Sequence, residues 1–111
     1  MVQGANKNIA LVKKFKRNIN KSIKVDKLIL YGSRAKGNFH RYSDFDLLIL
    51  SPDFKGIPWY KRPIKFYMMW KEDYPLEILC YTPEEIRKRM GKVGIVSEAL
   101  VSEALKEGIE I

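Results

Sequence analysis

The sequence of 111 residues contains one cysteine, Cys80, and one histidine, His40. A lone cysteine cannot form a disulfide within the chain, and one histidine with one cysteine matches no recognised zinc-binding spacing. The longest apolar runs, such as 47–50, fall far short of the roughly 20 residues that cross a bilayer. Acidic residues are also scarce, with 13 Asp and Glu against 21 Lys and Arg. We therefore expect a cytoplasmic protein whose surface attracts polyanions: nucleotides, nucleic acid or an acidic protein.

Length and composition predict one globular domain over residues 1–111, because the chain has the size of a single domain and no linker or low-complexity stretch divides it. A helix with a basic exposed side is predicted over 5–22, from apolar residues spaced by three and four. The core that carries the chemistry is predicted over 25–90, and a C-terminal helix and tail over 91–111.

Within the core, β-branched and apolar runs predict strands at 25–31, 44–50 and 76–81. The second run is too apolar for a strand with one wet face, so we expect it to be central in the sheet. Pro63 is well placed to open a short helix through residue 71. The sequence Thr82-Pro83-Glu84-Glu85 is typical of a capped helix start. That helix is predicted to break near 91–94 and to resume through Leu105, before a last extended piece at 109–111.

Two carboxylates, Asp44 and Asp46, open the second strand with one residue between them. Side chains alternate along a strand, so both acids leave on one face, about 7 Å apart along the chain. Acids forced together beside apolar residues repel each other and are costly to desolvate, which favours a compensating cation. An all-oxygen ligand set points to Mg²⁺, which keeps waters and takes further ligands from substrate phosphates.

A glycine and a serine, Gly32 and Ser33, follow the first strand and precede a segment that could form a helical turn. A glycine lets a phosphate approach the backbone, and the free amides and the Ser33 hydroxyl are donors for an anion. Arg34 and Lys36 add positive charge nearby. Because Asn38 stands where a Walker loop has lysine, the segment is not that ATPase motif, and it is not the dinucleotide GxGxxG motif.

A third acid, Glu77, stands in the otherwise uncharged strand 76–81. If that strand lies beside the strand of Asp44 and Asp46, all three carboxylates share one face. With a nucleoside triphosphate and two Mg²⁺ ions, the aspartates would bridge the metals. Glu77 would hold the catalytic metal and draw an acceptor hydroxyl toward the α-phosphate, in line with departing pyrophosphate. The residues therefore predict nucleotidyl transfer.

The pattern of a strand, Gly32-Ser33, about ten residues, Asp44-Phe45-Asp46 and a later lone acid resembles the polymerase β superfamily of nucleotidyltransferases. The short chain is most similar to its minimal nucleotidyltransferase (MNT) group, whose members are often encoded beside a HEPN-domain protein and act as the antitoxin of that pair. The resemblance covers roughly residues 25–90. Glu77 departs from the pattern, since the third acid of the family is often aspartate.

This resemblance implies an α+β fold: a small mixed sheet of three or four strands with helices packed on one face. It implies that Gly32 and Ser33 contact the triphosphate and that Asp44, Asp46 and Glu77 form the carboxylate triad. It further implies transfer of a nucleoside monophosphate, AMP from ATP, to a hydroxyl acceptor, with a side chain of a HEPN toxin as the suggested acceptor. A homo-oligomer and nucleic-acid binding stay open.

Each feature also has an ordinary structural explanation. The acids at 44 and 46 could form a solvated turn, and Glu77 could be an edge-strand charge that opposes aggregation. Gly32 and Ser33 could serve a tight turn and a helix cap, with Arg34 and Lys36 as solvated charges.

Two further segments allow two interpretations each. The aromatic and methionine-rich stretch 59–70 fits core packing or a partner interface. The basic N-terminal helix fits a solvated face or RNA binding. The alternatives to an enzyme are therefore a non-catalytic antitoxin that binds a HEPN-type partner, and a basic RNA-binding domain.

Overall fold

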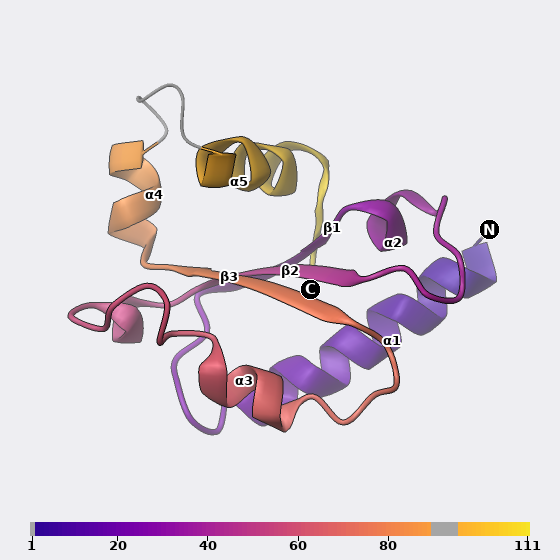
Figure 1. Ribbon diagram of the computed structural model, residues 1–111, viewed down its shortest axis with the longest axis horizontal. Helices are drawn as coiled ribbons and strands as arrows, with labels where there is room; N and C mark the ends of the chain where they lie inside the picture. The colour runs from indigo at the N-terminus through magenta and orange to yellow at the C-terminus, as the bar shows by residue number, and fades with distance from the viewer. Residues whose placement is uncertain (1, 90–95) are drawn as a thin grey trace.

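The computed structural model of the protein, which describes residues 2–89 and 96–111, is built on one four-stranded mixed sheet (Figure 1). In space the strands follow the order β3-β2-β1-β4, with β1 antiparallel to β2 and β4, and β2 parallel to β3. Strand β2 is internal, as its apolar sequence predicts. The strands are β1 Lys27–Tyr31, β2 Phe45–Leu50, β3 Leu76–Tyr81 and β4 Ile109–Glu110.

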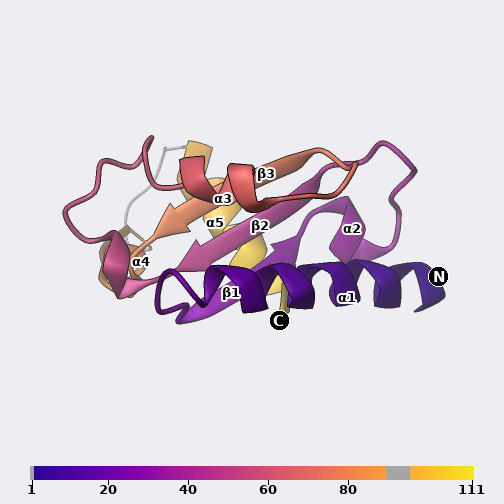
Figure 2. The ribbon, with the colours of Figure 1, turned by 90° about the horizontal axis from the view of Figure 1, so that it is seen from below.

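Helices lie on both sides of this sheet (Figures 1 and 2). Helices α1 and α3 lie on one side, and α4 and α5 lie on the other. The short helix α2 follows β1 directly, and the 3₁₀ helix η1 follows β2. The bounds are α1 Val2–Ile19, α2 Ser33–Lys36, η1 Pro52–Phe54, α3 Ile64–Met69, α4 Pro83–Arg89 and α5 Val96–Glu107.

The predicted class, α+β with a mixed sheet, is confirmed, but the expectation that helices pack on only one face is wrong. The cause is visible in β2, where Leu47 and Ile49 join the core beneath α1 and α3. Leu48 and Leu50, which point the other way, join the core beneath α4 and α5. A strand that is apolar on both faces needs cover on both faces, so the second layer of helices follows from this sequence.

The element boundaries stay close to the sequence prediction. Helix α1 begins and ends three residues before the predicted 5–22, and β3 spans the predicted 76–81. The start of α4 is capped as expected: the Glu85 amide donates to the Thr82 hydroxyl at 3.0 Å, and the Thr82 amide donates to Glu85 at 2.9 Å. The predicted break near 91–94 lies outside the described residues.

The aromatic stretch 59–70 divides into buried and exposed side chains, and the buried ones confirm the predicted use in core packing. Phe66 is fully buried, and the Trp70 ring packs on Phe15 and Phe45 at centroid distances of 5.1 and 5.2 Å. Trp59 and Met68, in contrast, are 74% and 72% exposed. The buried members close the core between the sheet and α1, and the exposed members form a surface of their own.

Cys80 is buried in the core between the sheet and α1, as expected for a lone cysteine in an apolar run, and burial raises the pKa of its thiol to about 12. None of the helices that the structure describes has the length and apolar character of a membrane span.

Candidate active site

Three polar side chains stand in one row across three neighbouring strands. Asp46 of β2 pairs in register with Tyr31 of β1 on one side and with Glu77 of β3 on the other. All three therefore point to the face that α5 covers, because their neighbours at alternate positions, such as Leu48, belong to the core on that side. The prediction that Asp46 and Glu77 share a face follows directly from this register.

Asp46 is half-buried and lies among other acids. Burial raises its pKa to about 6, with further contributions from the charges of Asp44, Glu77 and Glu103. Asp44, one residue before β2, and Glu77 are exposed to solvent. The site thus combines one partly desolvated carboxylate with two that solvent reaches, and their mutual repulsion favours a bound cation.

Gly32, at the end of β1, lies directly against the carboxylate of Asp46. Its φ of 75° and ψ of −158° belong to a region that is essentially closed to other residues. A side chain at this position would also overlap the Oδ2 atom of Asp46. Helix α2 begins at Ser33, directly after this turn. The amides of Ala35 and Lys36 both donate to the Gly32 carbonyl at 3.1 Å.

Arg34 lies inside the protein instead of facing the turn's exterior. Its guanidinium donates to the carbonyls of Ser43, Arg41 and His40 and to Asn8 Oδ1, over 3.1 to 3.5 Å. It is 3% exposed and also lies over the rings of Phe39, Phe45 and Tyr74. These contacts argue against the predicted phosphate contact and assign Arg34 to holding loop 37–44, which delivers Asp44 to the site.

Lys36 is exposed but paired with acids of α5. Its Nζ lies 3.6 Å from Glu103 and 3.4 Å from Glu107, and the hydrogen bond to Glu107 is the main cause that raises its pKa. A phosphate at the Gly32-Ser33 turn would therefore compete with α5 for this lysine.

Sequence reasoning missed two residues of this face, Tyr31 and Glu103. Tyr31 is 4% exposed, and burial together with the charges of Asp46, Glu103 and Glu77 raises the pKa of its hydroxyl. Strand alternation could have placed Tyr31 beside Asp46 once the β1–β2 pairing was assumed. Glu103 lies 57 positions after Asp46 in the chain, and no local pattern connects them.

The donor set at this face fits a hard divalent cation. The ligands on offer are carboxylates from Asp44, Asp46 and Glu77, and the raised pKa of Asp46 reflects negative charge that a cation would neutralise. Across residues 2–89 and 96–111, no three His, Cys, Asp or Glu side chains already converge into a ligand cluster. Mg²⁺ favours sites with few protein ligands, in which water and substrate phosphates complete its coordination shell.

Comparison with solved structures assigns the fold to the nucleotidyltransferases. The chain superposes with a TM-score of 0.65 on a crystal structure described as a nucleotidyltransferase from Sulfolobus solfataricus, over 98% of this chain and 83% of that one, at 14% identity. It also superposes with a TM-score of 0.53 on a toxin–antitoxin structure with AMP-PNP, over 96% of this chain and 71% of that one, at 21% identity.

The sequence itself matches the nucleotidyltransferase domain family over residues 11–109, and the chain belongs to that family. It is also 32% identical over 72 residues to a protein of Methanocaldococcus jannaschii that carries the name protein adenylyltransferase, covering 63% of this chain and 73% of that protein. These matches confirm the resemblance recognised in the sequence. By its family, the protein is a nucleotidyltransferase.

Proposed function

We propose that the protein transfers AMP from ATP to a hydroxyl group with the help of Mg²⁺. The observation that carries this proposal is the register of Asp46 with Glu77 on adjacent strands, with Asp44 just before them and the Gly32-Ser33 turn against Asp46. Acids on one side and a phosphate-accessible backbone on the other are what transfer from a triphosphate requires.

In this proposal each residue of the chain has one task. The Gly32-Ser33 turn binds the triphosphate through backbone amides and the Ser33 hydroxyl. Asp44, Asp46 and Glu77 would hold the metal ions, and when bound these ions neutralise the phosphate charge and orient the acceptor oxygen. Glu77, which is exposed, lies where an acceptor can approach from solvent.

The bond changes balance as follows. The acceptor oxygen forms a bond to the α-phosphorus while the bond from that phosphorus to the β-bridging oxygen breaks, releasing pyrophosphate. The hydroxyl proton passes to a water molecule and from there to solvent. The AMP unit remains attached to the acceptor as a phosphodiester.

We further propose that the acceptor is a side chain of a partner protein, with a HEPN-domain toxin as the candidate. The relative from Methanocaldococcus jannaschii named as a protein adenylyltransferase supports a protein acceptor. The toxin–antitoxin structure with AMP-PNP supports a nucleotide and a protein partner in the same assembly.

The test mixes the protein with the product of the adjacent gene, Mg²⁺ and ATP labelled at the α-phosphate. We expect the α-phosphate label to appear on the partner, and no label to appear when ATP is labelled at the γ-phosphate instead. EDTA and the substitution Asp46→Asn should each abolish the labelling. Label transferred equally from the γ-phosphate would contradict the proposed bond breakage.

A second candidate function, a non-catalytic antitoxin, is favoured by the exposed aromatic surface between residues 57 and 68. Such a protein would block its partner by occlusion alone. In the same experiment it would inhibit the partner without labelling it, and Asp46→Asn would inhibit as well as the wild type.

A further inference from the structure

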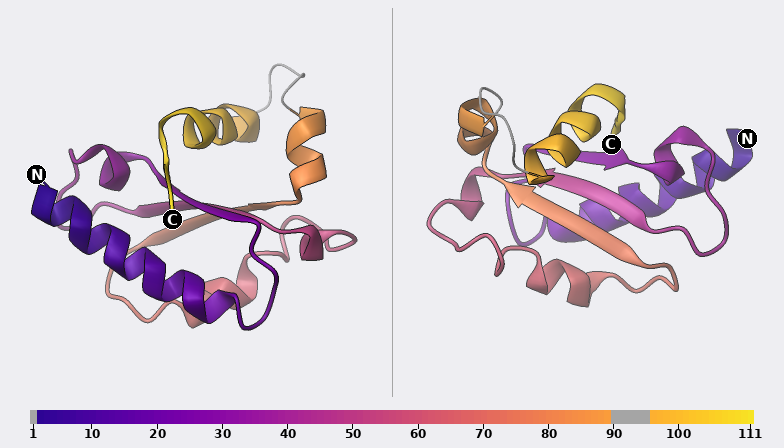
Figure 3. Two further views of the ribbon diagram at one scale, coloured as in Figure 1. Left: turned by 180° about the vertical axis from the view of Figure 1, so that it is seen from behind. Right: turned by 45° about the horizontal axis from the view of Figure 1, so that its top comes forward.

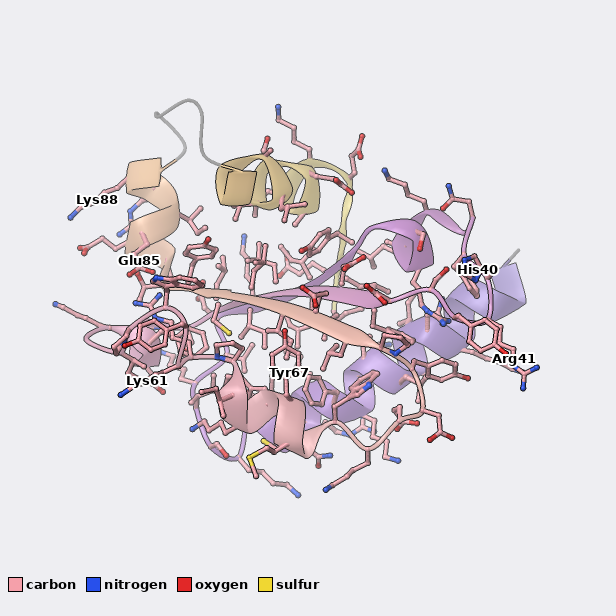
Figure 4. All side chains as sticks on the ribbon, viewed as in Figure 1. His40, Arg41, Lys61, Tyr67, Glu85 and Lys88 are labelled. Atoms are coloured by element: carbon pink, nitrogen blue, oxygen red, sulfur yellow. The ribbon has the colours of Figure 1, made fainter. Side chains whose placement is uncertain are left out.

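Exposed apolar side chains are concentrated in the segment that returns from β2 to β3. Of the eight large hydrophobic residues exposed in the described part of the chain, six lie between residues 57 and 68. One of them, Tyr67, is partly engaged, because its hydroxyl accepts a hydrogen bond from the Ile78 amide at 3.0 Å (Figure 4). We call the other five the 57–68 surface: Ile57, Trp59, Tyr60, Ile64 and Met68.

Two of these side chains line a groove. Ile57 and Ile64 line it together with Lys61 and Lys65, and its volume is 370 Å³. Met68 lies one helical turn beyond Ile64 on the same side of α3. The rings of Trp59 and Tyr60 meet edge to face at a centroid distance of 5.8 Å, and in the chain they lie between Ile57 and Lys61 of the groove.

The loop that carries Trp59 and Tyr60 is anchored to the body of the protein. Arg62, which is 8% exposed, donates to the Ile57 carbonyl at 2.7 Å and to the Cys80 carbonyl at 3.2 Å. It also makes two hydrogen bonds to Glu85 of α4, at 2.7 and 2.9 Å. Because the loop is held from both sides, its exposed rings are already ordered, and a partner need not spend free energy on ordering them.

The charge around the groove is mostly positive, and the one acid among its lining residues, Asp53, accepts a hydrogen bond from the Lys24 amide at 2.8 Å. Between residues 54 and 71 the sequence has five Lys and Arg and no Asp or Glu. Within the described part of the chain, Lys61 and Lys65 make no ion pair, whereas Arg62 is neutralised by Glu85. Figure 4 shows Lys61 at the end of the molecule opposite to His40 and Arg41 of loop 37–44. The positive charge of Lys61 is therefore separate from the loop that leads to the candidate active site.

We propose that the 57–68 surface docks a partner protein that presents apolar side chains ringed by carboxylates. Exposed Trp, Tyr, Ile and Met gathered on an ordered surface are typical of protein interfaces. The lysines require acids opposite them, since like charges brought together across an interface are unfavourable. A second copy of this chain would place lysine against lysine. The rings of Trp59 and Tyr60 could stack on nucleic-acid bases, but Ile57, Ile64 and Met68 could not, whereas apolar side chains of a protein partner suit all five.

This inference rests on the partner protein of the proposed function and names where that partner docks, but docking itself requires no transfer of AMP, so the two can be tested apart. The probe is a fluorescent amphipathic helical peptide with Leu and Trp on one face and Glu on the other. Two matched peptides carry Lys or Gln in place of Glu. Binding is measured by fluorescence anisotropy at low and moderate salt.

We expect the Glu peptide to bind at least about tenfold more tightly than the Lys peptide. Trp59→Ser and Ile64→Ser should each weaken it by about tenfold or more, because truncated interface anchors lose most of their contribution. Tyr42→Ser is the matched control, since Tyr42 is 72% exposed but lies in loop 37–44. Lys61→Glu with Lys65→Glu should abolish the preference for Glu, whereas the same charge change at exposed Lys13 and Lys106 should not.

Failure of the Glu peptide to bind, or equal weakening by Tyr42→Ser, would overturn the proposal. A single-stranded oligonucleotide or anionic phosphatidylserine vesicles that bind better, and lose binding with Trp59→Ser, would overturn it in favour of nucleic acid or membrane. Asp46→Asn should dock the Glu peptide like the wild type, which separates failure of docking from failure of the proposed transfer.

Discussion

The Oδ2 atom of Asp46 occupies the space that a Cβ atom on Gly32 would need. This contact joins the turn predicted to bind phosphate to the carboxylate predicted to bind metal, so neither can shift without the other. Gly32→Ala should therefore lower the free energy of unfolding by about 1 to 3 kcal/mol from backbone strain alone, with the overlap adding to it. Thermal unfolding and nucleotide binding by calorimetry check both consequences.

Gly56 provides the matched control for that substitution. It also has a positive φ, 82°, but a Cβ there would meet nothing within 4 Å. Gly56→Ala should lower stability by only about 1 kcal/mol and leave nucleotide binding intact. Equal loss of nucleotide binding in both variants would contradict a special role for the Gly32–Asp46 contact.

Asp46→Asn should stabilise the protein in the absence of ligand while abolishing transfer. Burial and the neighbouring acids raise the pKa of Asp46 from 3.8 to about 6, so the ionised form is less favourable in the folded state. Removing that charge should add about 1 to 2 kcal/mol at pH 7, after allowance for partial exposure of the side chain. Denaturant unfolding of both proteins measures the difference.

The same comparison has a defined pH dependence. Between about pH 4 and 6 the folded protein retains a proton on Asp46 that the unfolded chain has lost, so this residue's contribution to stability falls as pH rises. The advantage of Asp46→Asn should be fully present above about pH 6 and should vanish below pH 4. An Asp46→Asn variant that is less stable than the wild type at pH 7, with a deficit that disappears on acidification, would show that Asp46 has a lowered pKa instead.

Binding of Mg²⁺ and nucleotide should weaken on acidification, since the metal needs the ionised carboxylate. Below about pH 6 the affinity should fall by up to about tenfold for each pH unit. Calorimetry in buffers of different ionisation enthalpy should also detect proton release on binding at pH 6. Asp46→Asn should lose the part of both effects that comes from this carboxylate and keep the part that comes from the nucleotide phosphates.

Two ion pairs on α4 differ in burial and should differ in strength. In the Arg62–Glu85 pair the Arg62 side chain is 7% exposed. In the Lys88–Glu84 pair both side chains are exposed, by 74% and 62%. Arg62→Met should cost about 2 to 4 kcal/mol because it breaks the ion pair with Glu85 and removes the donor to two backbone carbonyls. Lys88→Met should cost at most about 0.5 kcal/mol. Chemical denaturation of the two variants tests this ranking.

The sequence was sufficient for the features that depend on local pattern. Alternation along 44–50 and 76–81 predicts which side chains share a face, and the register of Asp46 with Glu77 agrees with it. The capping sequence at Thr82 predicts the start of α4, where the structure has it. Strand alternation and helix capping act over a few residues, so they can be read without knowledge of the tertiary structure.

Features that depend on distant partners could not be predicted. Arg34 follows the Gly-Ser pair and looks available to phosphate, but Asn8, 26 residues earlier, and Tyr74, 40 residues later, enclose its guanidinium. Glu103 reaches the charge environment of Asp46 only because α5 folds back over the sheet. Figure 3 shows that return of the chain from two further directions, and nothing in the sequence around residue 103 specifies it.

Strands β2 and β3 run in the same direction, so the chain must travel back along the sheet between residues 51 and 75. The buried residues of that segment support the strand pair, because Phe66 and Trp70 fill the core beneath it and the Tyr67 hydroxyl accepts from the Ile78 amide. Its exposed residues, such as Trp59 and Met68, lie outside this packing. They could therefore be exchanged without displacing Asp46 relative to Glu77, and under the docking proposed above such an exchange is a route to redirecting the enzyme.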